Sequence, residues 1–218
     1  MGQKSSKRRE EVVSEIEKRM VAAVVARHKD PNRKVPPSFD AVALKFPVIN
    51  KAFCEVREVF NKFDVDKSKT IDLEEMKSCF KDLHFQIPEG EVQAYFKESD
   101  MDGSGKIDFR EFVVIIALSY LLAPPRRDNA LSPQLQKAVE SIVDAFMFCD
   151  KDGSGYVSKD EITNSFAETC GNLRRPSGGV RSVVGPRWLE MDWDANGTVS
   201  FKEFLFAFAD WVGADEED

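Results

Sequence analysis

Apolar residues along this 218-residue chain recur at intervals of three and four in several segments, with polar runs between them. This spacing places apolar side chains on one face of a helix, so it predicts a chain built mainly of amphipathic helices. We expect most of these side chains to form a core between paired helices. They are Val56, Val59, Phe60, Phe63, Met76, Cys79, Phe80, Leu83, Val92, Tyr95, Phe96, Val139, Ile142, Val143, Phe146, Ile162, Phe166, Phe201, Phe204, Leu205, Phe208 and Trp211.

Two segments depart from this pattern. Residues 112–123 are apolar on nearly every side, yet too short to span a bilayer, which takes roughly 20 residues. Such a helix must be covered all round, either by a partner protein lying in a groove or internally, for example by the N-terminal region. Between Arg8 and His28, Val13, Ile16, Met20 and Val24 also follow a helical spacing, and 32–37 end it. This helix would lie on a membrane surface or dock on the first half of the body.

Four of the polar runs share one arrangement of oxygen-bearing side chains. Each opens with an aspartate, has a glutamate at its twelfth position, and carries further oxygen-bearing residues at the third, fifth and ninth positions. The runs are 64–75, 100–111, 150–161 and 192–203. Four copies in order make chance a poor explanation of the pattern.

This spacing is that of a calcium-binding loop. Calcium takes about six to eight oxygens, supplied from positions 1, 3 and 5, a backbone carbonyl at 7, a group or water at 9, and both oxygens of the glutamate at 12. That glutamate favours calcium over magnesium, which prefers strict octahedra. The predicted ligands, with carbonyls at the seventh positions, are Asp64, Asp66, Ser68, Thr70, Asp72, Glu75, Asp100, Asp102, Ser104, Lys106, Asp108, Glu111, Asp150, Asp152, Ser154, Tyr156, Ser158, Glu161, Asp192, Asp194, Asn196, Thr198, Ser200 and Glu203.

The sixth and eighth positions of the loops also carry information. Gly105, Gly155 and Gly197 occupy the sixth position, where the chain turns sharply, but the first loop has Lys69. A side chain in the left-handed region costs about 1–2 kcal/mol, so we expect up to four calcium ions with the 64–75 site weakest. The eighth positions hold β-branched residues, which favour a short extended bridge between paired loops. They are Ile71, Ile107, Val157 and Val199.

Charge and composition narrow the classes of function. The net charge is -7, but residues 1–36 carry +5 and the remainder -12, which argues against nucleic acid as the main partner. The four cysteines and two histidines lack zinc-site spacing, and the cysteines are expected to be reduced, largely on or near helix core faces, in a cytosolic protein. No signal-peptide pattern is evident. No nucleophile elbow, phosphate-cradling glycine loop or histidine–cysteine site is evident either, so no catalytic residues are predicted and we expect no enzyme.

With these residues laid out, the chain resembles the calmodulin superfamily over about 44–212. Stretches 1–2, 44–47, 190–194 and 210–212 look like those of a plant calmodulin-like protein. The resemblance implies an all-α fold of two EF-hand pairs, or lobes, with short β bridges between paired loops, plus an N-terminal helix. The expected divisions are a basic arm and helix (1–43), the N-lobe (44–123), a linker (124–133), the C-lobe (134–213) and an acidic tail (214–218).

The resemblance implies a calcium sensor that relays signals by exposing apolar grooves to a target protein or amphipathic target helix. Two alternatives stay open, namely a calcium-regulated subunit of a phosphatase or kinase, and a calcium buffer.

The ends and insertions of the chain suggest modification. The start Met1-Gly2-Gln3-Lys4-Ser5-Ser6 fits the acceptor pattern for N-myristoylation of Gly2. One acyl chain anchors only weakly, so the basic residues that follow would add attraction to an anionic membrane surface, placing the protein in the cytoplasm and peripherally on the cytosolic face of a membrane. Residues 171–187 form an insertion interpreted as an exposed loop, with Arg174-Arg175-Pro176-Ser177 as an alternative kinase site.

Overall fold

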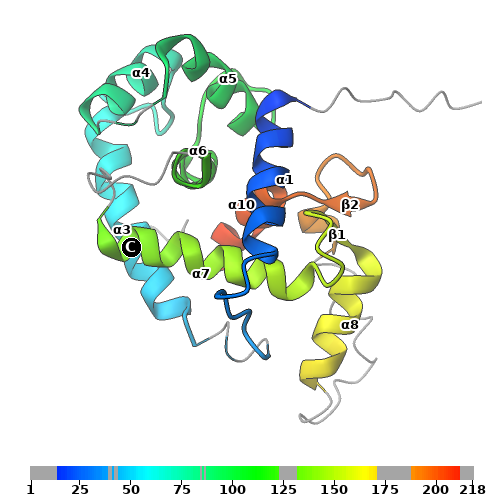
Figure 1. The fold of residues 1–218 in the computed structure, drawn as a ribbon. Coiled ribbons are helices and arrows are strands. Elements are labelled where there is room, and N and C mark those ends of the chain that lie inside the picture. The colour runs from blue at the N-terminus through cyan, green and yellow to red at the C-terminus, as the bar shows by residue number, and fades with distance from the viewer. Residues whose placement is uncertain are drawn as a thin grey trace, which may run out of the picture.

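The structure is a computed structural model that describes residues 14–38, 41, 44–83, 85, 87–122, 132–170 and 188–211. Its elements are mostly helical, which confirms the predicted fold class (Figure 1). They are α1 (Glu15–His28), α3 (Phe46–Phe63), α4 (Leu73–Asp82), α5 (Glu89–Ser99), α6 (Phe109–Leu122), α7 (Pro133–Cys149), β1 (Val157–Ser158), α8 (Lys159–Cys170), β2 (Thr198–Val199) and α10 (Phe201–Trp211).

The predicted bridges between paired loops are present. Ile71 and Ile107 exchange two backbone hydrogen bonds of 2.8 and 2.9 Å. Strands β1 and β2 pair antiparallel, with Val157 opposite Val199. The β-branched residue at the eighth position of each loop is therefore the residue that joins it to its partner loop.

Helix ends coincide with the starts of the acidic loops. The N–H groups of Asp64, Asp100 and Asp150 donate to carbonyls of the last turns of α3, α5 and α7. Each of these loops therefore begins where its helix stops. At the start of α4, the Asp72 side chain accepts from the N–H of Glu75, whose carboxylate accepts in return from the N–H of Asp72.

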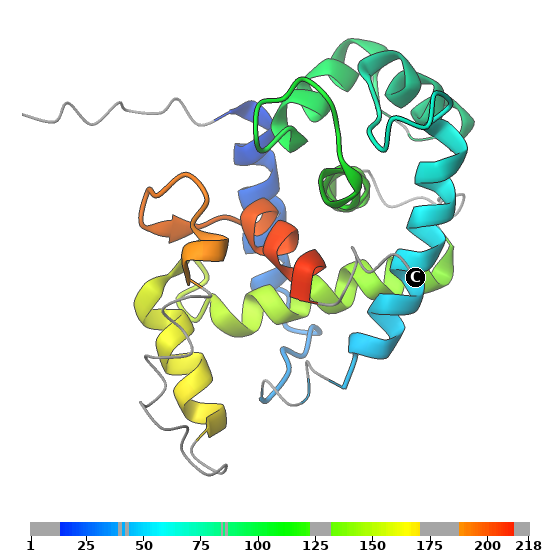
Figure 2. The same ribbon diagram turned by 180° about the vertical axis from the view of Figure 1, so that it is seen from behind.

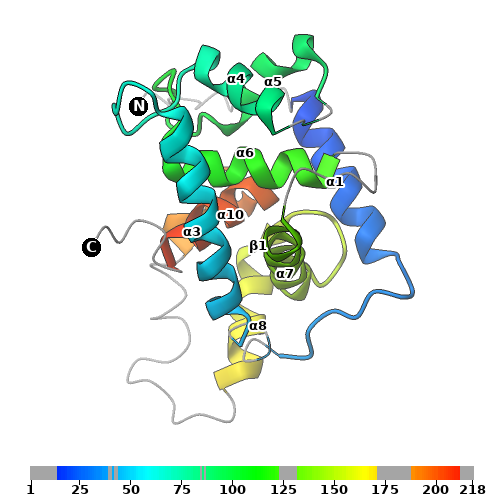
Figure 3. The same ribbon diagram turned by 90° about the vertical axis from the view of Figure 1, so that its left-hand side faces the viewer.

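Helix α6 lies in the middle of the molecule and is enclosed by its neighbours. Figure 1 looks along its axis, and Figure 3 shows it crossing the molecule from the side. It contacts α1, α3, α5, α7 and α10, and from Phe109 to Leu121 only Arg110 and Tyr120 are partly exposed. Of the two alternatives for residues 112–123, the structure therefore has internal cover along 112–122. A small cavity of about 170 Å³ adjoins Phe112 and Ile116 of this helix, between α3 and the start of α7.

The two expected lobes pack directly on each other. Helix α3 lies against α7, and α10 lies against both α6 and α7, as Figure 2 shows from behind. Phe46 of α3 meets Phe208 of α10 edge to face, with ring centroids 5.3 Å apart. Most of the linker, 124–131, and the acidic tail lie outside the described residues, so the division into lobes stays a prediction.

Helix α1 is docked on the body. Ile16, Met20 and Val24 are at most 4% exposed. The helix contacts α5 and α6 of the expected N-lobe and α7 of the expected C-lobe. The sequence alternative of docking is therefore the one observed, but α1 joins both lobes and not the first alone. Within the described part of the chain, no helix is long and apolar enough to cross a membrane.

Candidate metal centres

Each of the four loops gathers three carboxylates in space. In every loop the residues at the first, third and twelfth positions bring a ligand atom within 4.8 Å of one another. The groups are Asp64, Asp66 and Glu75; Asp100, Asp102 and Glu111; Asp150, Asp152 and Glu161; and Asp192, Asp194 and Glu203. These distances suit oxygens that surround a single cation.

The backbone of each loop holds the first aspartate in place. The N–H of the sixth residue donates to its carboxylate, at 3.0 Å from Lys69, 3.1 Å from Gly105, 3.0 Å from Gly155 and 3.3 Å from Gly197. Because these donors come from the turn itself, the turn and the carboxylate are ordered together. In the first and third loops the other oxygen of that aspartate accepts from the N–H of the fifth residue, at 2.9 Å from Ser68 and 3.0 Å from Ser154.

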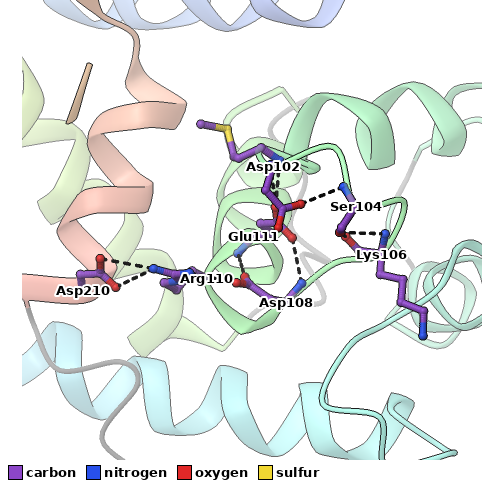
Figure 4. Close-up of polar contacts among 8 residues, drawn as sticks. Asp102, Ser104, Lys106, Asp108, Arg110, Glu111 and Asp210 are labelled. Carbon is purple, nitrogen blue, oxygen red and sulfur yellow. Dashed lines mark hydrogen bonds and ion pairs between the residues drawn. The ribbon is translucent and has the colours of Figure 1, made fainter. Parts of the chain in front are cut away.

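The closing glutamates are fixed by the same means. The N–H of the ninth residue donates to the glutamate at 2.8–3.0 Å in all four loops. In the first three loops the N–H of the second residue donates to its other oxygen, at 3.0 Å from Val65, 2.8 Å from Met101 and 2.9 Å from Lys151. Figure 4 shows this arrangement around Glu111.

The ninth-position side chains lie at the helix N-termini, outside the three-carboxylate clusters. Asp72 and Asp108 accept from the N–H groups of Glu75 and Glu111, at 2.9 and 2.8 Å. The hydroxyls of Ser158 and Ser200 donate to Glu161 and Glu203, at 2.7 and 2.8 Å. In this arrangement the ninth-position side chains position the closing glutamate. Whether they also bind the ion directly is not tested, so that role stays a prediction.

The fifth and seventh positions also lie together. The hydroxyls of Ser68, Ser104 and Ser154 donate to the seventh-position carbonyls of Thr70, Lys106 and Tyr156, at 3.0, 3.1 and 2.9 Å. In the fourth loop the Asn196 amide oxygen accepts from the N–H of Thr198 at 2.8 Å.

Burial makes several carboxylates costly to ionise. Desolvation raises the pKa of Glu111 to about 7, and it also raises the pKa values of Glu203 and Asp150. At the exposed third positions the pKa falls, because the Ser68 and Ser154 side chains hydrogen-bond to Asp66 and Asp152, and the Ser104 N–H to Asp102. The first three loops thus each contain a carboxylate with a lowered pKa, at the third position. The second, third and fourth loops each contain a buried carboxylate with a raised pKa, and a nearby cation would stabilise its ionised form.

A hard divalent cation fits this donor set. The gathered atoms are all oxygens, as calcium prefers. Oδ1 of Asp100 is buried and has no hydrogen-bond partner among the described residues, although a buried carboxylate oxygen needs one. The second loop therefore carries an unsatisfied acceptor beside two other carboxylates, as a cation site does.

The tight turns use positive φ at two positions per loop. Lys69 has φ 63°, as its place at the sixth position predicted. Lys67 and Ala195, both at fourth positions, also have φ 56°, where the second and third loops have Gly103 and Gly153. Positive φ at these two residues was not predicted, although the recurring glycines at the fourth position were a signal for it.

Other expectations have separate outcomes. Gly2 and residues 171–187 lie outside the described residues. Cys79 and Cys149 are buried as expected, and burial raises the pKa of both thiols to about 12, whereas Cys54 is exposed.

A contact that the sequence did not indicate joins two loops. Trp193 Nε1 of the fourth loop donates a hydrogen bond to the Met101 carbonyl of the second loop at 3.1 Å.

Comparison with known families agrees with the geometry. A model described as an EF-hand domain pair matches residues 53–116, and one described as an EF hand matches residues 142–167. These ranges contain the first two loops and the third.

Two curated relatives come from Arabidopsis thaliana. "Probable calcium-binding protein CML22" is 36% identical over 194 residues, covering 86% of this chain and 83% of the relative. "Probable calcium-binding protein CML21" is 38% identical over 186 residues, covering 83% and 78%. A third, calcium-dependent protein kinase 13 of the same plant, is 30% identical but matched over only 25% of its length, against 69% of this chain.

Proposed function

Since this chain belongs to the calmodulin-like EF-hand calcium-binding proteins, we propose that it relays calcium signals by uncovering apolar surface for a target protein. The residues that would hold the ion are the three-carboxylate clusters of the four loops, with the seventh-position carbonyls beside them. The bound ion would supply positive charge that offsets the repulsion and desolvation of these carboxylates.

One observation carries the proposal. The closing glutamates of the second and fourth loops, Glu111 and Glu203, stand in the first turns of α6 and α10, and both are buried. These two helices pack against each other at the centre of the molecule. A movement of either glutamate on binding an ion would therefore shift its helix and alter the packing between α6 and α10.

The apolar surface that could be exposed is that of α6, which the neighbouring helices now bury. From Phe112 to Leu118 its side chains are at most 4% exposed, so even a modest shift of a neighbouring helix would uncover apolar area. Each fully buried Val, Leu, Ile or Phe contributes about 1.5–3 kcal/mol when covered. A target helix with an apolar face would regain that free energy by replacing the lost cover.

The experiment is binding of a hydrophobic dye to the full chain in calcium, in magnesium and in chelator. We expect dye fluorescence to rise in calcium alone, and the rise to disappear in the Glu111→Gln/Glu203→Gln double variant. Calcium uptake with identical dye signals would reject the sensor proposal in favour of a buffer, which binds the ion and barely opens. Measurable turnover of a substrate would contradict the absence of catalysis, which remains a prediction.

Membrane attachment is a separate part of the proposal. It is supported by the acceptor pattern at Gly2 and the +5 charge of residues 1–36. Mass spectrometry of the chain expressed with an N-myristoyltransferase, followed by sedimentation with anionic vesicles, tests it. We expect the wild-type chain to sediment and Gly2→Ala to remain in the supernatant; equal sedimentation would contradict acyl anchoring.

A further inference from the structure

The third loop differs from the others in being covered by α1. A methyl group placed on Gly155 would lie 2.8 Å from Cγ1 of Val21 and 3.2 Å from Cγ2 of Val25, and one on Gly153 would lie 3.0 Å from Cδ2 of His28. A methyl group placed on Gly103, Gly105 or Gly197 would have no neighbouring atom within 4 Å. Among the loop glycines of the described chain, only those of 150–161 are in contact with another element.

Polar contacts join the same two elements. The Tyr156 hydroxyl, on the residue whose carbonyl is the predicted seventh-position ligand, donates to Glu17 at 3.2 Å. Glu17 also lies 3.6 Å from Nζ of Lys202, which precedes the closing glutamate of the fourth loop. Helix α1 therefore contacts the third loop along its length and reaches the end of the fourth.

The helix that leads into the third loop is held by the segment after α1. Arg33 donates to Asp144 of α7 at 2.8 and 3.0 Å and pairs with Glu140 at 2.6 Å. All three side chains are less than one-third exposed, so this charge cluster is partly shielded from water. The loop and its incoming helix are thus fixed against one continuous N-terminal segment.

We propose that α1 is a positioning element of the third calcium site, in which Val21, Val25 and His28 hold 150–161 in the conformation that gathers Asp150, Asp152 and Glu161. The inference rests on the proposed uptake of calcium by these loops. A loop already ordered by packing loses less conformational freedom on binding, so its affinity rises. By linkage, calcium at this loop strengthens the docking of α1 to the same extent.

The test compares two neutral double substitutions on the same helix. Val21→Ser/Val25→Ser removes the packing on Gly155, whereas Ala22→Ser/Ala26→Ser changes two exposed positions with the same spacing. Calcium is titrated into each full-length protein by calorimetry, after circular dichroism confirms folding. We expect the first variant to bind at the third loop about fivefold or more weakly, the lower range of typical coupling, and the second to match wild type.

The Glu161→Gln background assigns the effect to one loop. There the difference between the two serine variants should vanish, because the third site is already lost. Equal affinities of the two variants, tighter binding by Val21→Ser/Val25→Ser, or a difference that persists with Glu161→Gln would each overturn the inference while leaving calcium uptake by the other loops intact. If Glu161→Gln leaves the wild-type titration unchanged, the third site and the inference both fail, as does the proposed function at that loop.

A second pair of variants tests the contact without calcium. Gly155→Ala and Gly105→Ala strain the backbone alike, since both residues have positive φ (84° and 76°), but only the first places a methyl group against α1. In chelator, we expect amide exchange of residues 15–28 to quicken in Gly155→Ala and not in Gly105→Ala. Unchanged exchange in both would overturn the inference.

Discussion

At the scale of the residue, the sixth position of each loop separates the first site from the others. All four residues there have positive φ and donate to the first aspartate, so the loops share one backbone conformation. Lys69 adopts it with a Cβ, at a cost of about 1–2 kcal/mol relative to a residue without that strain. Lys67 adds a second such residue in the same loop.

Replacing Lys69 with glycine is therefore expected to strengthen calcium binding at the first loop, by up to about tenfold if the strain falls mainly on the bound state. Calorimetric titration measures the change. Lys69→Gln is the control, because it removes the charge but keeps the Cβ. An equal gain in both variants would attribute the effect to charge and contradict the role of strain.

Glu111 predicts a pH dependence at the second loop. Burial raises its pKa to about 7 from the ordinary 4.5, so the proton and the cation compete for the same carboxylate near neutral pH. In chelator, its contribution to the free energy of unfolding is fully present below about pH 4.5 and lost as pH rises through about 7. Calcium affinity should change in the opposite direction and fall as pH is lowered through 7.

Titrations at pH 6 and 8, each in two buffers of different ionisation enthalpy, measure the protons released with calcium. We expect release at pH 6 to exceed that at pH 8, and the excess to shrink in Glu111→Gln. Equal proton release at both pH values would contradict the raised pKa.

At the scale of the element, α6 is a helix whose cover comes from five others. Leu118 is 0% exposed, Ile115 is 0% exposed, and Phe112 meets Phe60 of α3 with ring centroids 5.4 Å apart. This helix has no face polar enough to be exposed to water, so it depends on the surrounding helices to bury it on every side.

Leu118→Ala should accordingly lower the free energy of unfolding by about 2–5 kcal/mol, the range for a large core residue cut to alanine. Leu44→Ala is the matched control, since Leu44 is 82% exposed and its truncation should change stability by no more than about 0.5 kcal/mol. Urea denaturation in chelator measures both. Similar losses for the two variants would contradict the central placement of α6.

At the scale of the whole molecule, contacts between the two expected lobes link the second loop to the fourth. Trp193 donates to the Met101 carbonyl, while the Met101 N–H donates to Glu111 at 2.8 Å. Arg110 forms an ion pair with Asp210 of α10 (Figure 4). The two side chains are 3.2 Å apart, and the Arg110 guanidinium lies 4.6 Å from the Phe206 ring centroid. We therefore expect occupancy of one loop to alter the affinity of the other, although they belong to different pairs.

We expect Trp193→Phe to weaken this coupling, because phenylalanine keeps the ring on Phe206 but lacks the N–H donor. One hydrogen bond contributes about 1 kcal/mol, or roughly fivefold in affinity. The measurement is the affinity of the second loop with and without Glu203→Gln, in the wild-type chain and in the Trp193→Phe variant. If Glu203→Gln changes the calcium affinity of the second loop equally in the wild-type chain and in Trp193→Phe, the two loops are not coupled through this contact.

The local features of the protein follow from its amino-acid sequence. The positions of the acidic residues, the bridge at Ile71 and Ile107, and the left-handed Lys69 all follow from twelve-residue windows in which backbone geometry and ligand chemistry are set by near neighbours. The helices around them follow from the same local periodicity, and for that reason they too were predictable.

Which segments pack against one another, in contrast, is known from the folded structure alone. The sequence left two covers open for residues 112–123 and two locations for the helix before residue 32, because an apolar face specifies that it must be buried but not by which surface. The folded chain places α1 over Gly155 and α6 beneath five helices, and both arrangements depend on the shapes and charges of segments that are separate in the sequence.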